Sequence, residues 1–286
     1  MGLTTRPEFL KAGSHRLSLK RPLVMGIVNV TPDSFSDGGR YFSIGKAIDH
    51  AWAQINEGAD ILDIGGESSR PGAEPISVAE EIARTIPVIE AIHRSGVPVS
   101  IDTTKAEVMH AAIGAGASMV NDINALQGDG AVQLMADTDV AVCIMHMQGS
   151  PGSMQQAPSY GNVVEEVRKF LSDRIEVVMA AGVSRERLAI DPGFGFGKTV
   201  QHNLALLADL QSLAGLGCAV LAGLSRKSTL GIITGRPVDE RIHASVAAAM
   251  IAIQRGASVV RVHDVGATRD AIAILQAVEG ESGCRA

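Results

Sequence analysis

Polar or ionisable residues stand at the end of every short apolar run in this chain. In chain order they are Asn29, Asp63, Asp102, Asn121, His146, Asp191, the triplet Ser225-Arg226-Lys227, and Arg261 with His263. Carboxylates accept hydrogen bonds, lysine donates them, and arginine pairs with anions in a forked geometry. A fold that gathered these run ends would surround one small polar ligand. Helix capping by Asp and Asn explains one or two of the positions but not all of them.

The apolar runs themselves have the composition of buried strands. They are Leu23–Val28, Ile61–Ile64, Val97–Ile101, Met119–Val120, Ala141–Met145, Leu188–Ile190, Ala219–Ala222 and Val259–Val262. Between them lie stretches with apolar residues at three- and four-residue steps, which indicate helices. Examples are Ile44–Asn56, Ala79–His93, Ala106–Ile113, Val163–Ala181 and His243–Arg255. Near-continuous apolar strands separated by helices indicate a parallel sheet covered on both faces.

Eight such units predict a (β/α)8 TIM barrel with the active site at the C-terminal ends of its strands. In this fold, function sits on the loops that follow the strands, and here every strand leads into a polar residue. A doubly wound open sheet would concentrate such groups at one switch point. Barrels of about 250 residues form one domain. We therefore expect a single domain over residues 1–286, with residues 1–20 as an N-terminal extension.

Composition argues against several other classes of protein. The chain has 286 residues, of which 46% are apolar, and a net charge of −6, so a general nucleic-acid-binding role is disfavoured while a local anion site is not. The three cysteines show no paired spacing, as in a reducing compartment, and we expect a cytoplasmic protein. No apolar run approaches the roughly 20 residues of a membrane span. We expect neither nucleic acid nor membrane as a partner.

The stretch MGIVNVTPDSFSDGG, residues 25–39, begins as a buried strand and continues as a polar, glycine-rich loop. Gly38 and Gly39 permit positive φ angles, so this loop is suited to closing over a ligand. Phe35 would then stack on a flat ligand. Packing of Phe35 on the barrel rim explains the strand pattern equally well.

The stretch DPGFGFGKT, residues 191–199, imitates a phosphate-binding P-loop. Its end satisfies the pattern G-x-x-x-x-G-K-[ST], but Pro192 stands where the first glycine is required, and proline has no N–H to offer a phosphate. The glycines then allow close packing of backbone against a planar ligand, and Lys198 and Thr199 begin the next helix. His146 has no partner at metal-ligand spacing, so we expect it to be hydrogen-bonded in the rim or core.

Seven motifs occur in one order along the chain. They are MGIVNVTPDSFSDGG, ILDIGGESSRPGA, IDTTK, VNDINAL, DPGFGFGKT, LAGLSRKS and RVHDV. They resemble the motifs of the dihydropteroate synthase family, and the resemblance covers roughly Pro22 to Thr268. That family joins a 7,8-dihydropterin carrying a 6-hydroxymethyl diphosphate to p-aminobenzoate and releases pyrophosphate. One departure is Ser69, where the family usually has threonine. Serine keeps the hydroxyl group, so we expect function to survive.

The resemblance implies a pterin pocket in the barrel mouth. Its residues would be Asp63, Asp102, Asn121, Met145, Asp191, Phe196 and Lys227. Asp191 would accept hydrogen bonds from the amino edge of the ring, and Lys227 would donate to its oxygen and ring nitrogen. Met145 and Phe196 would supply apolar walls.

Three carboxylates of this set have other or additional interpretations. Asp63 would orient its neighbours rather than touch the ring. From the residues alone, Asp102 is also a candidate cap for the following helix. Asp191 is also a candidate for the start of a β-turn before Pro192.

Positive charge for a diphosphate comes from the eighth strand. Arg261 and His263 alternate along it, so their side chains point the same way, toward a usual phosphate position in this fold. The resemblance assigns the diphosphate to Asn29, Ser69, Arg261 and His263, and Arg70 is near enough in the second loop to help bind it. It also makes Asn29 a ligand of the cofactor Mg²⁺, which commonly uses one protein oxygen with phosphate oxygens and water. A strand-end salt bridge is the other interpretation of Arg261.

The resemblance further implies an SN1-like condensation, in which pyrophosphate leaves before the amine attacks. The catalytic residues would be Asp37, Lys227, Arg261 and His263. Asp37 would stabilise the cation and complete the Mg²⁺ shell. Phe35, Pro71 and Ser228 would form the p-aminobenzoate site once the first two loops have closed.

Two other functions are compatible with the sequence alone. A methyltetrahydrofolate-binding methyltransferase barrel would share pterin recognition but would leave Arg261, His263 and the SFSDGG loop without a role. A pterin-binding paralogue without activity would be told apart by a turnover assay. The family forms homodimers, so we expect a homodimer, and the apolar stretch Ala244–Ile253 offers a surface for it.

Overall fold

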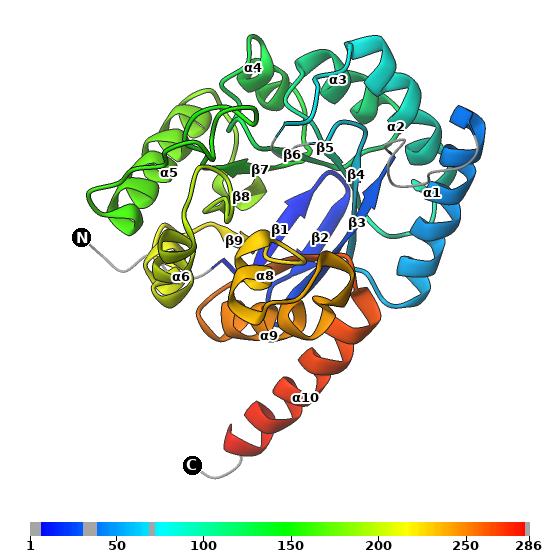
Figure 1. The fold of residues 1–286 in the computed structure, drawn as a ribbon. Coiled ribbons are helices and arrows are strands. Elements are labelled where there is room, and N and C mark those ends of the chain that lie inside the picture. Colours follow the sequence, from blue (N-terminus) through cyan, green and yellow to red (C-terminus); the bar gives the residue numbers. More distant parts are fainter. Residues whose placement is uncertain (1–6, 31–38, 69–71, 284–286) are drawn as a thin grey trace.

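Eight parallel strands close into a barrel, which confirms the expected (β/α)8 TIM fold (Figure 1). The computed structural model describes residues 7–30, 39–68 and 72–283. The barrel strands are β3 (Leu23–Asn29), β4 (Ile61–Gly65), β5 (Val99–Asp102), β6 (Met119–Asp122), β7 (Ala141–Met145), β8 (Leu188–Asp191), β9 (Ala219–Ala222) and β10 (Val259–Val262). They pair in chain order, and β10 closes on β3. All carboxyl ends therefore meet at one mouth.

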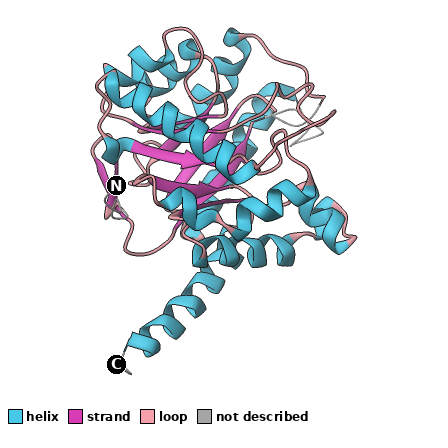
Figure 2. Ribbon diagram, turned by 90° about the vertical axis from the view of Figure 1, so that its left-hand side faces the viewer, coloured by secondary structure: helices cyan, strands magenta, loops and turns pink. Residues whose placement is uncertain are grey.

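Helices follow the strands and cover the outside of the barrel, as Figure 2 shows. They are α1 (Gly39–Asn56), α2 (Val78–Ile92), α3 (Ala106–Gly114), α4 (Ala131–Ala136), α5 (Val163–Ala180), α6 (Val200–Ala208), α7 (Leu210–Ala214), α8 (Ser228–Thr234), α9 (Ile242–Gln254) and α10 (Val265–Gly283), with short 3-10 turns at Arg185–Arg187 and Val238–Glu240. The far end of α10 projects from the barrel (Figure 1). Local capping fixes several starts: the Ser77 hydroxyl accepts the Glu80 N–H at 3.2 Å before α2.

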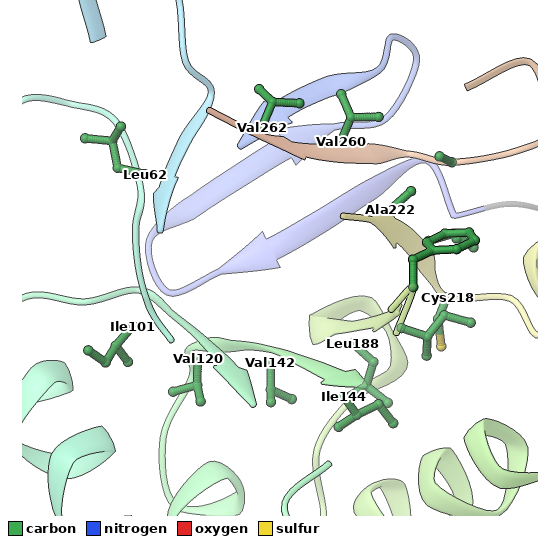
Figure 3. Close-up of a cluster of buried hydrophobic side chains, with 14 of the residues drawn as sticks. Leu62, Ile101, Val120, Val142, Ile144, Leu188, Cys218, Ala222, Val260 and Val262 are labelled. Atoms are coloured by element: carbon green, nitrogen blue, oxygen red, sulfur yellow. The ribbon is translucent and has the colours of Figure 1, made fainter. Parts of the chain in front are cut away.

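The outward-facing side chains of the strands form the main hydrophobic core beneath the helices. Leu62, Ile101, Val120 and Val142 are fully buried on the successive strands β4 to β7, and Figure 3 shows them together with Val262 of β10. Burying each such side chain contributes about 1.5–3 kcal/mol. Each of these positions alternates with one that faces the barrel interior, so the strand pattern also fixes which residues line the site.

The lower half of the barrel interior is apolar and is covered by a hairpin at the N-terminal end. The hairpin pairs β1 (Phe9–Ala12) with β2 (His15–Ser18) in antiparallel register. Leu10 and Ala12 are buried against the first residues of the barrel strands. At the turn, Gly13 adopts a φ of +58°, which glycine tolerates well. Leu10 and Ala12, which lie within the expected N-terminal extension, therefore belong to the barrel core.

Candidate active site

The inward-facing positions at the carboxyl ends of the strands are polar. Strand register places Asp102 beside Asn121 and Met145 beside Asp191, so each pair shares one face of the sheet. Arg261 pairs with Met25, whose side chain packs in the interior. The structure thus gathers Asp63, Asp102, Asn121, Met145, Asp191 and Arg261 at the mouth.

Arg261 stands at the centre of this layer and is held by two carboxylates. Its Nε donates to Asp63 Oδ2 at 2.5 Å, and one Nη donates to Asp102 Oδ2 at 2.8 Å. Asn121 Nδ2 donates to the same Asp63 oxygen at 2.9 Å. Four strands, β4, β5, β6 and β10, are therefore tied together by charge-assisted bonds, the strongest class of hydrogen bond in proteins. One oxygen of Asp63 thus accepts hydrogen bonds from both Arg261 and Asn121.

The charges of this cluster do not balance, because two carboxylates share one guanidinium. Burial raises the pKa of the Asp102 carboxyl to about 7, although the charge on Arg261 acts to lower it. Burial also acts to lower the pKa of Arg261, but Asp63 and Asp102 raise it above its ordinary value. Arg261 therefore stays cationic, while burial favours the protonated form of Asp102.

A second group of the expected site residues lies on the side of β8 and β9. Asp191 Oδ1 accepts the backbone N–H of Gly193 at 2.6 Å. Burial raises the pKa of Asp191, and the charge on Lys227 opposes that rise. Lys227 Nζ donates to the carbonyl oxygen of Phe194 and lies 4.7 Å from the centroid of the Phe196 ring. Burial lowers the pKa of Lys227 to about 8. An acceptor, a donor and an aromatic face thus converge.

The end of the DPGFGFGKT stretch differs from its expected role as the first turn of a helix. Thr199 is the N-cap of α6, with its hydroxyl accepting the His202 N–H at 3.2 Å, while Lys198 is buried beside His146. His146 is buried and hydrogen-bonded, as expected, and burial holds its pKa at about 3. Nothing in this stretch forms a phosphate cradle of the P-loop kind, because Pro192 has no N–H.

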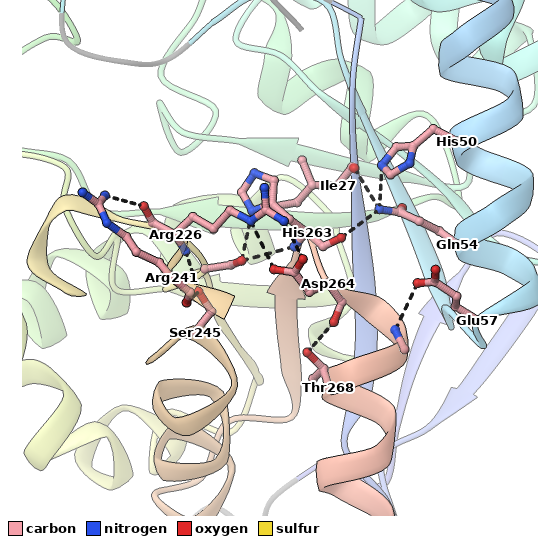
Figure 4. A network of polar contacts seen from close by, with 12 residues as sticks. Ile27, His50, Gln54, Glu57, Arg226, Arg241, Ser245, His263, Asp264 and Thr268 are labelled. Carbon is pink, nitrogen blue, oxygen red and sulfur yellow. Dashed lines mark hydrogen bonds and ion pairs between the residues drawn. The ribbon is translucent and has the colours of Figure 1, made fainter. Parts of the chain in front are cut away.

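A polar network holds the loop after β9 against the end of β10 (Figure 4). Ser225 Oγ lies 3.0 Å from His263 Nδ1 and accepts the His263 backbone N–H at 3.2 Å. Arg226 forms a forked ion pair with Asp264, at 3.1 and 2.5 Å. Its φ of +58° is uncommon for a non-glycine residue. These bonds stabilise that conformation, and it fixes the direction in which the next residue, Lys227, enters the mouth.

Asn29 is the described residue that best suits a metal at the mouth. It ends β3, and its carboxamide oxygen is the hard type of ligand that Mg²⁺ prefers. Within the described ranges, no group of three or more His, Cys, Asp or Glu side chains could hold a metal by itself. A metal bound at Asn29 would therefore need further oxygens from a ligand and from water, and the residues present fit that kind of site.

The remaining expected residues are five that the structure does not describe, and Ser228. Those outside the described residues are Phe35, Asp37, Ser69, Arg70 and Pro71. Ser228 is the exposed first residue of α8, directly after Lys227.

Sequence reasoning missed a charged bridge beside the mouth. Lys105 forms ion pairs with Glu67 and with Glu81, the latter at 2.6 Å, and so joins the loops that follow β4 and β5. Glu67 also accepts the Ile76 N–H at 3.0 Å. Both Lys105 and Glu67 lie inside recognised motifs, which was a signal of importance. Their meeting depends on the barrel register, which the motifs do not state.

Known proteins share this arrangement. The family model described as pterin binding enzyme matches residues 25–263. The dihydropteroate synthase of Haemophilus influenzae is 48% identical over 269 residues, which cover 94% of this chain and 98% of that protein. The Xanthomonas albilineans dihydropteroate synthase solved with 4-aminobenzoic acid has a TM-score of 0.90 and 51% identity, covering 95% of this chain and 98% of that one. The Burkholderia cenocepacia dihydropteroate synthase complexed with 7,8-dihydropteroate has a TM-score of 0.90 and 47% identity, covering 99% and 100%.

A closed parallel barrel with carboxylates, an amide and a lysine at its mouth, matched by that family model, is a pterin-binding enzyme. The relatives of this chain identify the family within that class. The chain belongs to the dihydropteroate synthase family. It is a transferase, and its function is dihydropteroate synthesis in the folate pathway. In the part of the chain that is described, every helix is too short or too polar to cross a membrane.

Proposed function

We propose that the polar layer inside the mouth binds the dihydropterin ring and that 7,8-dihydropteroate is made there. The observation that carries this is the placement of buried Asp191 and half-buried Lys227 next to Gly223: a Cβ on that glycine would lie 3.8 Å from Asp191 Oδ2 and 3.9 Å from Lys227 Nζ. A pterin has a donor edge and a carbonyl acceptor. Asp191 would serve the first and Lys227 the second, with the Phe196 ring as a wall.

Asp102, Asn121 and Met145 would complete the pocket from the other strands. Their inward position on β5, β6 and β7 supports this. Asp63 would act through them, because it already accepts hydrogen bonds from Asn121 and Arg261.

The diphosphate would lie at the β10 side of the mouth. We assign it to Asn29, Ser69, Arg70, Arg261 and His263. The two carboxylates that grip Arg261 fix its guanidinium in advance, which is the arrangement that favours a developing anion. Ser225 fixes the imidazole of His263 in the same way. When present, Mg²⁺ at Asn29 would supply positive charge to the diphosphate oxygens.

Bond breaking would precede bond making. As the C–O bond to the diphosphate breaks, its electron pair leaves with pyrophosphate, and positive charge spreads from the methylene into the dihydropterin ring. The amine of p-aminobenzoate then forms the C–N bond and loses its proton to water. Catalysis would rest on orientation and electrostatics. Asp37 would stabilise the cation, and Phe35, Pro71 and Ser228 would bind p-aminobenzoate above the pterin.

A homodimer in the cytoplasm fits the surface and the thiols of this chain. Ile232 and Ile233 on α8 and Ile251 on α9 are large apolar side chains exposed on neighbouring helices, and such patches often mark protein contacts. Cys143 and Cys218 are buried free thiols. Light scattering during size-exclusion chromatography would test the dimer, and a monomer at all concentrations would contradict it.

Pyrophosphate release tests the proposed function directly. The protein is mixed with 6-hydroxymethyl-7,8-dihydropterin diphosphate, p-aminobenzoate and Mg²⁺, and pyrophosphate and dihydropteroate are measured in equal amounts. The expected result is stoichiometric formation of both, abolished by omitting either substrate. Pterin binding without product would instead identify an inactive pterin-binding paralogue.

A further inference from the structure

Lys198 and His146 are buried side by side and have no part in the mechanism above. Lys198 Nζ donates to His146 Nδ1 at 2.9 Å, to the His146 carbonyl oxygen at 3.3 Å and to the Phe196 carbonyl oxygen at 3.0 Å. All three ammonium hydrogens therefore have acceptors, and none of these acceptors is a carboxylate. Burying a cation without a carboxylate partner destabilises the folded state, so core packing alone does not explain a lysine at this position.

The loop that contains Phe196 is seated directly on the loop after β7, which contains His146. A Cβ on Gly193 would lie 1.9 Å from the His146 carbonyl oxygen, and one on Gly197 would lie 2.4 Å from the Gln148 carbonyl oxygen. Both glycines also have positive φ angles. The backbone of residues 193–197 therefore packs directly against residues 146–148. A small displacement on that side should shift the Phe194–Phe196 turn on the side of the site.

Two lysines grip this turn from opposite sides. On the site side, Lys227 donates to the carbonyl oxygen of Phe194 and faces the ring of Phe196. On the far side, Lys198 donates to the carbonyl oxygen of Phe196. The aromatic wall and the resting acceptor of Lys227 thus belong to one short turn whose back is fixed by Lys198.

Lys198 also acts on the charge of Asp191. Burial raises the pKa of Asp191, while the charges on Lys227, Lys198 and Arg261 lower it. Cys143 faces it from β7 as a neutral thiol, because burial raises the pKa of that group. Burial lowers the pKa of Lys198 to about 7, against the attraction of Asp191. Below pH 6 the ammonium form of Lys198 dominates and favours the ionised carboxylate.

We propose that Lys198 is a positioning residue of the pterin site, which fixes the Phe194–Phe196 turn from behind and sets positive charge beside Asp191. The inference rests on the proposed pterin pocket and adds to it a residue that does not touch the ring. It also gives a role to the lysine of the DPGFGFGKT motif, which does not bind phosphate.

Three variants separate the turn, the charge and general stability. Lys198→Met removes both the donors and the charge at similar size. Lys198→Gln keeps two N–H donors but no charge. The matched control is Thr199→Ala, which removes the cap of α6 next to it and should lower the melting temperature by a few degrees. Each is titrated with 6-hydroxymethyl-7,8-dihydropterin by calorimetry from pH 5 to 8.

At pH 8 the dissociation constant should rise about tenfold or more in Lys198→Met, by the loss of buried hydrogen bonds. In Lys198→Gln it should rise by about threefold or less, because donors remain. In both variants the pH at which affinity falls to half should move up by about half a unit, because Asp191 loses a stabilising charge. Thr199→Ala should stay within about twofold of wild type and show no such shift.

Binding by wild type together with unchanged affinity and an unchanged pH profile in Lys198→Met would overturn the inference. An equal loss in Thr199→Ala would overturn it too, because the effect would then be general. If Lys198→Met does not fold, the pH profile of Lys198→Gln decides alone. Failure of wild type to bind the pterin would instead count against the proposed function.

Discussion

The two ends of the barrel interior use the same strands for opposite purposes. On four strands an apolar residue at the lower level is followed two positions later by a polar one at the upper level: Ile61 by Asp63, Met119 by Asn121, Ala189 by Asp191, and Val259 by Arg261. Two residues advance a strand by about 6.6 Å. A core closed by a hairpin and a charged site therefore lie one layer apart, and a substitution at one level should leave the other level almost unchanged.

Arg261→Ala should have the largest effect, because it should lower both the stability of the fold and the turnover of the enzyme. It leaves Asp63 and Asp102 buried without their cation, which should lower the free energy of unfolding by about 3–5 kcal/mol. Turnover should fall by at least ~100-fold through loss of a preoriented charge. Urea unfolding and pyrophosphate release measure the two effects. Arg261→Lys, which keeps the charge but not the fork, should recover part of the stability. A loss of stability below about 1 kcal/mol would show that the cluster does not need the arginine.

Asp191→Asn should sharpen the comparison by changing binding alone. It replaces the acceptor that we propose for the donor edge of the pterin by a group that also donates, so pterin affinity should fall by about 2–4 kcal/mol. Stability should hardly decrease, because burial already disfavours the charged form of Asp191. Calorimetry with the bare pterin measures the affinity. A dissociation constant within about threefold of wild type would remove Asp191 from the pocket.

Leu10→Ala tests the opposite end. It truncates a fully buried side chain of the hairpin and should lower the free energy of unfolding by about 2–3 kcal/mol, at the low end for such changes because the cap can settle into the space. The KM values for both substrates should stay at their wild-type values. Lys11→Ala, on the partly exposed face of the same strand, is the matched control and should change stability by less than about 0.5 kcal/mol. A raised KM in Leu10→Ala would show that the two levels are coupled.

The smallest effect concerns the pH dependence of stability. His146 has an ordinary pKa of 6.5, and burial lowers it to about 3. Below pH 6.5 the unfolded chain therefore binds a proton that the folded chain does not, so this contribution to stability is lost as the pH falls from 6.5 toward 3, by at most about 1.4 kcal/mol per unit. In His146→Asn that slope should be absent. Urea titrations of both proteins at pH 7.5, 6 and 5 measure it, and parallel curves would contradict it.

The strands were predictable because their apolar runs are local and alternate with polar ends. The expected ranges of β7, β9 and β10 match the observed ones, while β5 begins at Val99 rather than Val97. Pro98 explains that shift, because it has no N–H for the strand ladder. The N-terminal hairpin was missed, although Gly13 between two short alternating runs was the available signal.

The partners of the charged residues were not predictable. Arg261 meets Asp63 across 198 positions of sequence, and Lys198 meets His146 across 52. Such meetings depend on strand order and register, which local pattern does not contain. A lysine just before a helix is normally solvated. Its burial here follows from the close seating of the glycines at 193 and 197, a tertiary fact.

In the part of the chain that the structure describes, the hairpin closes the lower end of the barrel. Leu10 and Ala12 fill the N-terminal end of the barrel interior. Both substrates would therefore enter, and both products would leave, through the mouth. A pterin ring bound at the polar layer, as proposed, would lie beneath the substrate that binds next. The joined product must then lift out before another ring can reach the polar layer. The molecule that binds last must therefore leave first, and any molecule bound at the mouth slows the release of a ligand bound beneath it.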